Sequence, residues 1–250
     1  MKFSTKSDLG RKRQVNQDCC AAKMLGGNLL LCAVCDGMGG TAGGEIASKT
    51  AINSFFGFIE QKIAALGDTP PAKKIIALLS NAVSRANSEV YSLAQRQSEL
   101  YGMGTTLVAA LVTKDKLFCV NVGDSRLYYM SEHGILQCSH DHSYVQYLVD
   151  LGKLTEEEAR HSAKRNIITR AVGTSASVTA DVHVTDIDPR KGGYILLCSD
   201  GLTNHVSDGD IYETVMNADL SLEEKTGALI SAANAGGGLD NITAVLAELN

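Results

Sequence analysis

LLLCAVCDGMGGTAGGE, residues Leu29 to Glu45, is the stretch on which the interpretation of the whole chain depends. Its first part, Leu29 to Cys35, is apolar and uncharged, and so short a run ending in glycines is typical of a buried strand. Asp36 follows where the chain must leave the sheet, and five of the next eight residues are glycines. A carboxylate beside open glycine backbone suits a hard cation. The alternative is that Asp36 only caps a helix beginning near Gly43 or Gly44.

Composition predicts a soluble, cytoplasmic protein that forms a single domain over residues 1–250. The chain is 44% hydrophobic and 20% charged, which suffices for a sizeable core. Its formal charge is −5 and its one basic cluster is Arg11-Lys12-Arg13, so a nucleic-acid surface is not expected. No apolar run reaches the roughly 18 residues that span a bilayer, and the N-terminus has no apolar signal segment. Nothing marks an oligomer interface, so we expect a monomer.

Two groups of residues have side chains that could ligate a metal, but we do not expect either group to do so. The seven cysteines are odd in number and scattered, which indicates a reducing compartment rather than a disulfide framework. Cys32 and Cys35 form a CxxC pair, but residues three apart on a strand point to opposite faces, and no second CxxC completes a zinc site. His140-Asp141-His142 resembles a metal cluster, yet alternate residues diverge on a strand and align poorly on a helix, so we expect a solvated loop or hydrogen bonding there instead.

The remaining elements follow from hydrophobic spacing and capping signals. Apolar residues recur at helical spacing from Glu45 to Leu66, and a second helix follows Pro70-Pro71. Other helices are predicted for Ser143 to Leu151 and after the capping signals at Thr155, Ser207 and Ser221. Strands are predicted within residues 1–18, in a hairpin from Lys23 to Asp36 around Gly26-Gly27-Asn28, and over Gly104 to Val112, Lys116 to Val122, Leu127 to Met130, Val178 to Thr185, Gly193 to Cys198 and Ile242 to Leu249.

An acid recurs at the edge of four apolar strands. The pairs are Asp36-Gly37, Gly123-Asp124, Asp200-Gly201 and Asp240-Asn241, and Asp18 is a possible fifth acid. Each pair alone is an ordinary turn former. Strand ends of one sheet system lie together, however, and several carboxylates at one edge must either raise their pKa values or share a cation. Because no reliable His or Cys donor accompanies them, the sequence predicts an all-oxygen site for Mg²⁺ or Mn²⁺.

Such a site suggests phosphate chemistry. Two ions could share a bridging water, lower its pKa and hold phosphate oxygens for in-line attack. A guanidinium from Arg13 or Arg126 could grip the phosphate in a bidentate manner. The chain has no nucleophile elbow and no P-loop, so activated water fits better than a covalent intermediate.

At this point the chain resembles a known family. RQVNQD, DGMGGTAGGEIAS, GMGTTLVAAL, VGDSRLY, DHSYVQYLVDLGKLTEEEA, NIITRAVGT, LLCSDGL and DNITAVLAEL occur in the order seen in bacterial metal-dependent Ser/Thr protein phosphatases of the PP2C (PPM) class. The resemblance covers essentially the whole chain. It implies an α+β fold, a four-layer α/β/β/α sandwich of two antiparallel sheets flanked by helix pairs.

The resemblance also implies roles for individual residues around two or three Mn²⁺ or Mg²⁺ ions. Asp36 would bridge two ions, with the carbonyl of Gly37 on one and Asp200 and Asp240 on the other. Asp18 would act mainly through coordinated water, Asp124 would help to hold a third ion, Arg13 would bind the substrate phosphate, and residues from about 142 to 164 would form a flap.

Three departures from the family pattern are visible. Arg11 and Lys12 stand next to Arg13, which leaves the phosphate-gripping residue open by one or two places. Gln17 replaces an acid that commonly precedes Asp18, and we do not expect loss of metal from this change. Met38 stands where animal members carry a proposed general acid, so the donor of the leaving-group proton is not assigned.

The sequence thus predicts a cytoplasmic phosphatase acting on phosphoserine and phosphothreonine in proteins, opposing a bacterial Ser/Thr kinase. A phosphoprotein-binding pseudo-phosphatase and a hydrolase of small phosphoesters remain as alternatives.

Overall fold

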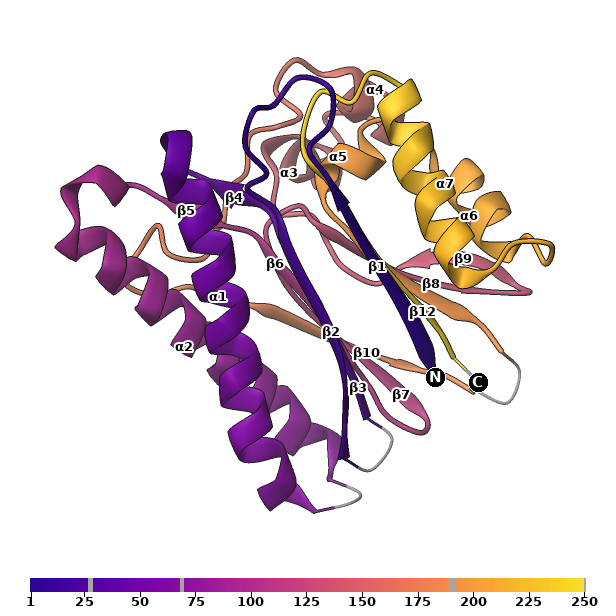
Figure 1. Cartoon of the computed structure of the whole chain (residues 1–250), viewed down its shortest axis with the longest axis horizontal. Coiled ribbons are helices and arrows are strands. Elements are labelled where there is room, and N and C mark those ends of the chain that lie inside the picture. Colours follow the sequence, from indigo (N-terminus) through magenta and orange to yellow (C-terminus); the bar gives the residue numbers. More distant parts are fainter. Residues whose placement is uncertain (27–28, 68–69, 189–191, 250) are drawn as a thin grey trace.

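Two five-stranded antiparallel sheets lie face to face at the centre of the molecule (Figure 1). The computed structural model describes residues 1–26, 29–67, 70–188 and 192–249. The first sheet has the strand order β1 (Lys2–Asp8), β12 (Ile242–Glu248), β11 (Tyr194–Cys198), β8 (Arg126–Ser131) and β9 (Gly134–Gln137). The second has the order β10 (Asp181–Asp186), β7 (Lys116–Val122), β6 (Leu107–Val112), β3 (Leu29–Cys35) and β2 (Cys19–Leu25).

Strand β3 is the apolar run from which the interpretation began, and it is buried on both faces. Leu31 and Cys35 belong to the core between the second sheet and its helices. Leu30 and Cys32 belong to the core between the two sheets. A strand covered on both sides must be apolar throughout, which explains why the run shows no alternation. The prediction that Cys32 and Cys35 point to opposite faces is confirmed.

Helices cover the outer face of each sheet, and the predicted four-layer sandwich is confirmed. The helices α1 (Gly40–Ile63) and α2 (Ala72–Arg96) pack on the second sheet, and α6 (Asp208–Met216) and α7 (Leu222–Ala235) pack on the first (Figure 1). Shorter elements are α3 (Tyr144–Asp150), α4 (Glu156–His161), α5 (Asp200–Thr203) and the 3₁₀ helices η2 (Ala64–Leu66) and η3 (Ser98–Leu100). Within the described part of the chain, no helix is both long and apolar enough to cross a membrane.

Helix starts with a side-chain cap were predicted well, whereas the start of α1 was not. Thr155 and Ser221 each form a complete capping box, and Ser207 accepts a hydrogen bond from the Asp210 amide. Helix α1 begins at Gly40, before the predicted start, and its N-cap residue is a glycine without a capping side chain that could mark this start in the sequence.

Three strand predictions need correction, and one turn lies outside the described residues. Strand β2 begins at Cys19, before the predicted start of its hairpin at Lys23. Gly104 to Val112 is divided into β5 (Gly104–Thr105) and β6, and β5 pairs with β4 (Gly37–Met38) in a small separate sheet. The chain divides at Thr106 because its amide donates to the Asp36 carbonyl. Strand β10 begins later than predicted, at Asp181. The predicted turn at Gly26-Gly27-Asn28 includes residues 27 and 28, which are not described, although the flanking strands pair as expected.

Candidate metal centre

The predicted strand-end acids converge on one cavity at the end of the sandwich where the sheets meet the loops. This cavity has a volume of about 530 Å³. Six of the seven predicted site residues line it: Arg13, Asp36, Gly37, Asp124, Asp200 and Asp240. The seventh, Asp18, is not among the lining residues and is only 8% exposed. Residues up to 227 positions apart in the chain therefore meet at one place.

Close backbone contacts at two glycines bring the acid-bearing turns together. A Cβ atom on Gly37 would lie 2.1 Å from the Gly44 carbonyl oxygen and 2.6 Å from the Gln17 carbonyl oxygen. A Cβ atom on Gly201 would lie 2.0 Å from the Asn241 carbonyl oxygen. Only glycine permits such contacts with backbone atoms. The turn that carries Asp36 thus packs on the start of α1, and the turn that carries Asp200 packs on the loop before β12.

The backbone of Asp36 is held by two threonines while its carboxylate is left to the cavity. The Asp36 amide donates to Thr106 Oγ1 at 2.9 Å. The Asp36 carbonyl accepts from the Thr106 amide and from Thr105 Oγ1, each at 2.8 Å. These three bonds fix the position of the carboxylate without occupying its oxygens.

Asn241 fastens the loop between β1 and β2 that carries Arg13. Its side-chain amide donates to the carbonyl oxygens of Leu9 at 3.0 Å and Val15 at 3.1 Å. Its side-chain oxygen accepts from the Gln17 amide at 2.8 Å. The side chain is 4% exposed, so each of these bonds is shielded from water and holds the loop against the end of β12.

Asp18 lies beneath the cavity with one oxygen bonded and the other unpaired. Ser199 Oγ donates to Asp18 Oδ2 at 2.7 Å. Asp18 Oδ1 is buried and has no hydrogen-bond partner. Burial, and after it the negative charges of Asp200 and Asp240, raise the pKa of Asp18 to about 7. An acceptor that is buried without a donor is costly unless a cation or water satisfies it.

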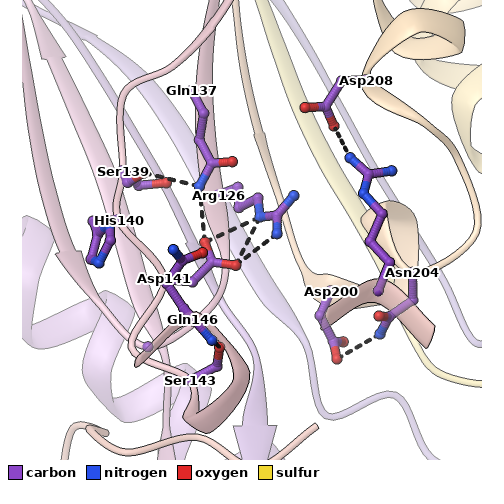
Figure 2. A network of polar contacts seen from close by, with 12 residues as sticks. Arg126, Gln137, Ser139, His140, Asp141, Ser143, Gln146, Asp200, Asn204 and Asp208 are labelled. Atoms are coloured by element: carbon purple, nitrogen blue, oxygen red, sulfur yellow. Dashed lines mark hydrogen bonds and ion pairs between the residues drawn. The ribbon is translucent and has the colours of Figure 1, made fainter. Parts of the chain in front are cut away.

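The acids that line the cavity repel one another. Burial, followed by the charges of neighbouring carboxylates, raises the pKa of Asp36 and of Asp124 well above the ordinary range. Burial and the charge of Asp240 also raise the pKa of Asp200. Asp200 Oδ2 accepts from Asn204 at 2.9 Å, whereas its Oδ1 is buried without a partner (Figure 2). A hard divalent cation relieves both the repulsion and the unpaired oxygens, so this donor set fits Mg²⁺ or Mn²⁺.

Arg13 pairs with one of these acids. Its guanidinium lies 2.7 Å from Asp240 Oδ2, and Asp240 Oδ1 accepts from the Asn241 amide at 2.8 Å. In the described ranges, no three His, Cys, Asp or Glu side chains are gathered closely enough to ligate one ion together.

Arg126, the other candidate for gripping a phosphate, is committed to a structural pair. It forms a bidentate ion pair with Asp141, with distances of 2.8 to 3.1 Å (Figure 2). It also donates to the Tyr128 hydroxyl at 3.0 Å. It lines a second cavity rather than the one that holds Arg13. Arg126 therefore supports the loop after β9, and Arg13 is the better candidate.

The expectation of hydrogen bonding for the two histidines is confirmed. His142 Nδ1 accepts from the Gly123 amide at 3.0 Å, and the His142 amide donates to the Gly123 carbonyl at 2.9 Å. This reciprocal pair fixes the turn that presents Asp124. His140 Nε2 lies 3.0 Å from Asp150 Oδ2, at the end of α3.

Several residues that support the site were not given that role from the sequence. These are Thr105, Thr106, Ser199 and Asn241. Each sits beside a candidate acid in the sequence or in a neighbouring strand, and polar residues at the end of an apolar run were the available signal. Their partners lie far away in the chain, so the bonds themselves could not be predicted.

The raised pKa of Asp18 leads to a prediction about the metal-free protein. A folded pKa of about 7 exceeds the unfolded value near 4, so Asp18 contributes stability that is complete below about pH 4 and is lost as pH rises through about 7. With EDTA present, we expect the free energy of unfolding to fall from about pH 4 to about pH 8, by at most roughly 4 kcal/mol from this group. Urea denaturation at stepped pH measures this change.

Asp18→Asn supplies the control, because asparagine has the same shape and does not titrate. Its slope of stability against pH should be flatter than that of the parent chain. Equal slopes for the two proteins would contradict the assignment of the titration to Asp18.

Known proteins provide the comparison for this site. The family model for protein phosphatase 2C matches residues 10–234. The chain is 35% identical over 243 residues to the serine/threonine phosphatase stp of Listeria monocytogenes, which covers 97% of this chain and 94% of that protein. A crystal structure of serine/threonine phosphatase Stp1 from Staphylococcus aureus superposes with a TM-score of 0.91 at 33% identity, covering 100% of this chain and 95% of that one. The catalytic domain of the phosphatase PstP, in complex with two manganese ions, superposes with a TM-score of 0.81 at 34% identity, covering 100% and 98%. With a family model over most of its length and relatives that align with nearly all of it, this chain belongs to the protein phosphatase 2C family.

Proposed function

We propose that this chain hydrolyses phosphoserine and phosphothreonine in proteins, using Mn²⁺ or Mg²⁺ ions held by the acids of the cavity. The observation that carries the proposal is the convergence of these acids, with buried oxygens of Asp18 and Asp200 left unpaired. Two or three ions would be held by Asp18, Asp36, the Gly37 carbonyl, Asp124, Asp200 and Asp240. Bound there, a divalent cation supplies positive charge that lowers the pKa of water and neutralises phosphate oxygens.

In this proposal the residues of the chain position the substrate and disfavour a covalent intermediate. Arg13 would orient the phosphate through its guanidinium fork. Among the described residues that line the cavity there is no Cys, Ser or His, and the Thr106 hydroxyl is bonded to Asp36 and Ser125. This lining favours attack by water over a covalent intermediate. Met38 lines the cavity and carries no titratable proton.

We propose that the phosphoprotein lies along a second cavity beside the first. This cavity of about 660 Å³ lies between helices α3 and α4 and the α5–α6 segment, and Asp124 and Asp200 line both cavities. Residues 142–164 would form the flap over it. The flap is fastened at its base, because the Thr169 amide donates to the His142 carbonyl at 2.7 Å and the Tyr144 amide to the Ile167 carbonyl at 2.8 Å.

We further propose a cytoplasmic, monomeric enzyme with a single catalytic domain over residues 1–250, opposing a Ser/Thr kinase. All seven cysteines are free thiols, which suits a reducing compartment. Phosphoprotein substrates imply a kinase that supplies them.

Phosphate release from a phosphothreonine peptide tests this function. We expect turnover with Mn²⁺, loss of turnover in excess EDTA, and recovery when Mn²⁺ is restored, because the acids need the ion to act. Folded, Mn²⁺-saturated protein that binds the peptide without turnover would indicate a pseudo-phosphatase. Faster turnover of small phosphoesters than of phosphopeptides, measured side by side, would indicate the other alternative. Turnover that survives chelation would contradict the role of the acids.

A further inference from the structure

Two cysteines lie directly opposite each other at the root of the candidate metal centre. Cys19 is the first residue of β2, Cys35 is the last residue of β3, and the two are partners in the antiparallel register. Asp18 immediately precedes Cys19, and Asp36 immediately follows Cys35. Any covalent link between these cysteines would therefore act on the two backbone segments that present Asp18 and Asp36.

The two thiols share one face of the sheet. Cys35 is fully buried in the core under α1 and α2, and the partly buried Cys19 packs against the same core. Directly opposed residues of antiparallel strands have Cα atoms about 4.5 or 5.5 Å apart, and a disulfide accepts Cα separations of about 4.4 to 6.8 Å. The Cβ atoms of such pairs lie about 4.5 to 5.5 Å apart and must approach to about 3.5 to 4.5 Å in a disulfide. A disulfide between Cys19 and Cys35 is therefore geometrically possible, and its formation would draw the two strands slightly together.

We propose that Cys19 and Cys35 are an oxidation site that forms a cross-strand disulfide under peroxide and thereby weakens Mn²⁺ binding. The disulfide does not depend on the proposed function, whereas its effect on the metal does. Pulling the two strands together displaces Asp18 and Asp36 from the positions that their supporting hydrogen bonds set. Loss of an outer-shell contact costs a metal site about 10- to 100-fold in affinity, and we expect about tenfold here.

The chemistry is a two-step oxidation by hydrogen peroxide. The Cys19 sulfur attacks one peroxide oxygen, the O–O bond breaks, and a sulfenic acid and one water result. The Cys35 sulfur then attacks the sulfenic sulfur, the S–S bond forms, and a second water leaves. Two thiols lose two electrons and two protons, and peroxide is reduced to two waters. Burial raises the pKa of Cys19, although the nearby Lys49 opposes the shift, and burial also raises the pKa of Cys35.

The same two strands carry a matched control pair. Cys20 packs against the core between the sheets, to which Cys32 belongs, on the opposite face from Cys19 and Cys35. Cys20 is the register partner of Val34, and Cys32 is the partner of Ala22. Cys20 and Cys32 are thus diagonal neighbours, with Cα atoms about 7 to 8 Å apart, which is too far for a disulfide without backbone movement.

Peptide mapping after peroxide treatment of the full chain tests the disulfide. Trypsin cuts after Arg13, Lys23 and Lys49, so Cys19 and Cys20 fall in the peptide 14–23, and Cys32 and Cys35 fall in 24–49. The double variant Cys20→Ser/Cys32→Ser should still yield the linked peptides, and dithiothreitol should separate them. Cys19→Ser, a change at a partly exposed position, should yield none. Linked peptides in Cys19→Ser, or their absence from the double variant, would overturn the proposal.

Calorimetry with Mn²⁺ tests the consequence. The oxidised double variant should bind Mn²⁺ about tenfold more weakly than its reduced form, with recovery on reduction, while Cys19→Ser should be unaffected by peroxide. Unchanged affinity in the oxidised double variant would overturn the coupling to the metal. Failure of the reduced protein to bind Mn²⁺ would instead overturn the proposed function, and the peptide map would still decide whether the disulfide forms.

Discussion

Asp36→Asn is expected to lower the turnover of a phosphothreonine peptide at saturating Mn²⁺ by roughly a thousandfold or more. Each tenfold corresponds to about 1.4 kcal/mol, and a metal ion supplies several kcal/mol of charge stabilisation to a phosphoryl transition state. Asparagine keeps the shape of the side chain but removes the charge that would bridge two ions. The threonine contacts at this position use only the backbone of Asp36, so the turn itself should stay in place.

The fold should survive this change, and metal-free stability should rise. Burial and neighbouring carboxylates raise the pKa of Asp36, so an ionised carboxylate there is unfavourable and its loss relieves repulsion. Thermal unfolding in EDTA and calorimetric titration with Mn²⁺ separate this effect from the loss of turnover. We expect a higher unfolding temperature in EDTA and weaker Mn²⁺ binding than in the parent chain.

Asp115→Asn is the matched control. Asp115 is an exposed acid in the turn between β6 and β7, and removing it changes the net charge equally. It follows the end of β6 that is remote from Asp36, since Val112 pairs with Leu30 at the start of β3. Activity should be unchanged. Near-native turnover in both Asp36→Asn and Asp240→Ala would show that the acids have been assigned the wrong role.

The sequence predicts much of this fold because its strongest signals are local. Strand β3 is a continuous apolar run since both of its faces are covered, and the capping boxes at Thr155 and Ser221 use residues three apart in the chain. Helix α1 and the small β4–β5 sheet were mispredicted for the opposite reason. Their boundaries are set by a glycine turn and by contacts between Asp36 and Thr106, which no local pattern records.

The candidate site, like the fold, is predictable from the sequence only in part. That acids at strand ends would lie together follows from sheet geometry, and the cavity that Asp36, Asp124, Asp200 and Asp240 line agrees with it. The sequence does not predict that Asp18 lies beneath this cavity. The bonds of Asn241 and the pairing of Arg13 with Asp240 span more than 200 residues, so only the folded chain reveals them.

Gly201→Ala should destabilise the fold strongly at a position without a charged or polar side chain. Its Cβ would lie 2.0 Å from the Asn241 carbonyl oxygen and 2.9 Å from the carbonyl carbon. Backbone atoms cannot swing aside as a flexible side chain can, so the start of α5 and the loop before β12 must separate. Overpacking of this kind costs about 2 to 3 kcal/mol or more, which for a chain of this size lowers the unfolding temperature by roughly 5 to 10 °C.

That separation also moves Asp200 away from Asp240, so Mn²⁺ affinity and turnover should both fall in Gly201→Ala even at temperatures where the protein is folded. Gly57→Ala is the matched control, because Gly57 lies inside α1 and an added Cβ there meets nothing within 4 Å. Alanine favours a helix over glycine by about 0.5 to 1 kcal/mol, so this variant should be slightly more stable and fully active. Thermal unfolding and Mn²⁺ titration of the two variants, measured side by side, test these expectations for stability and Mn²⁺ affinity. Gly201→Ala behaving like Gly57→Ala would mean that the close approach of the two turns does not hold Asp200 and Asp240 together.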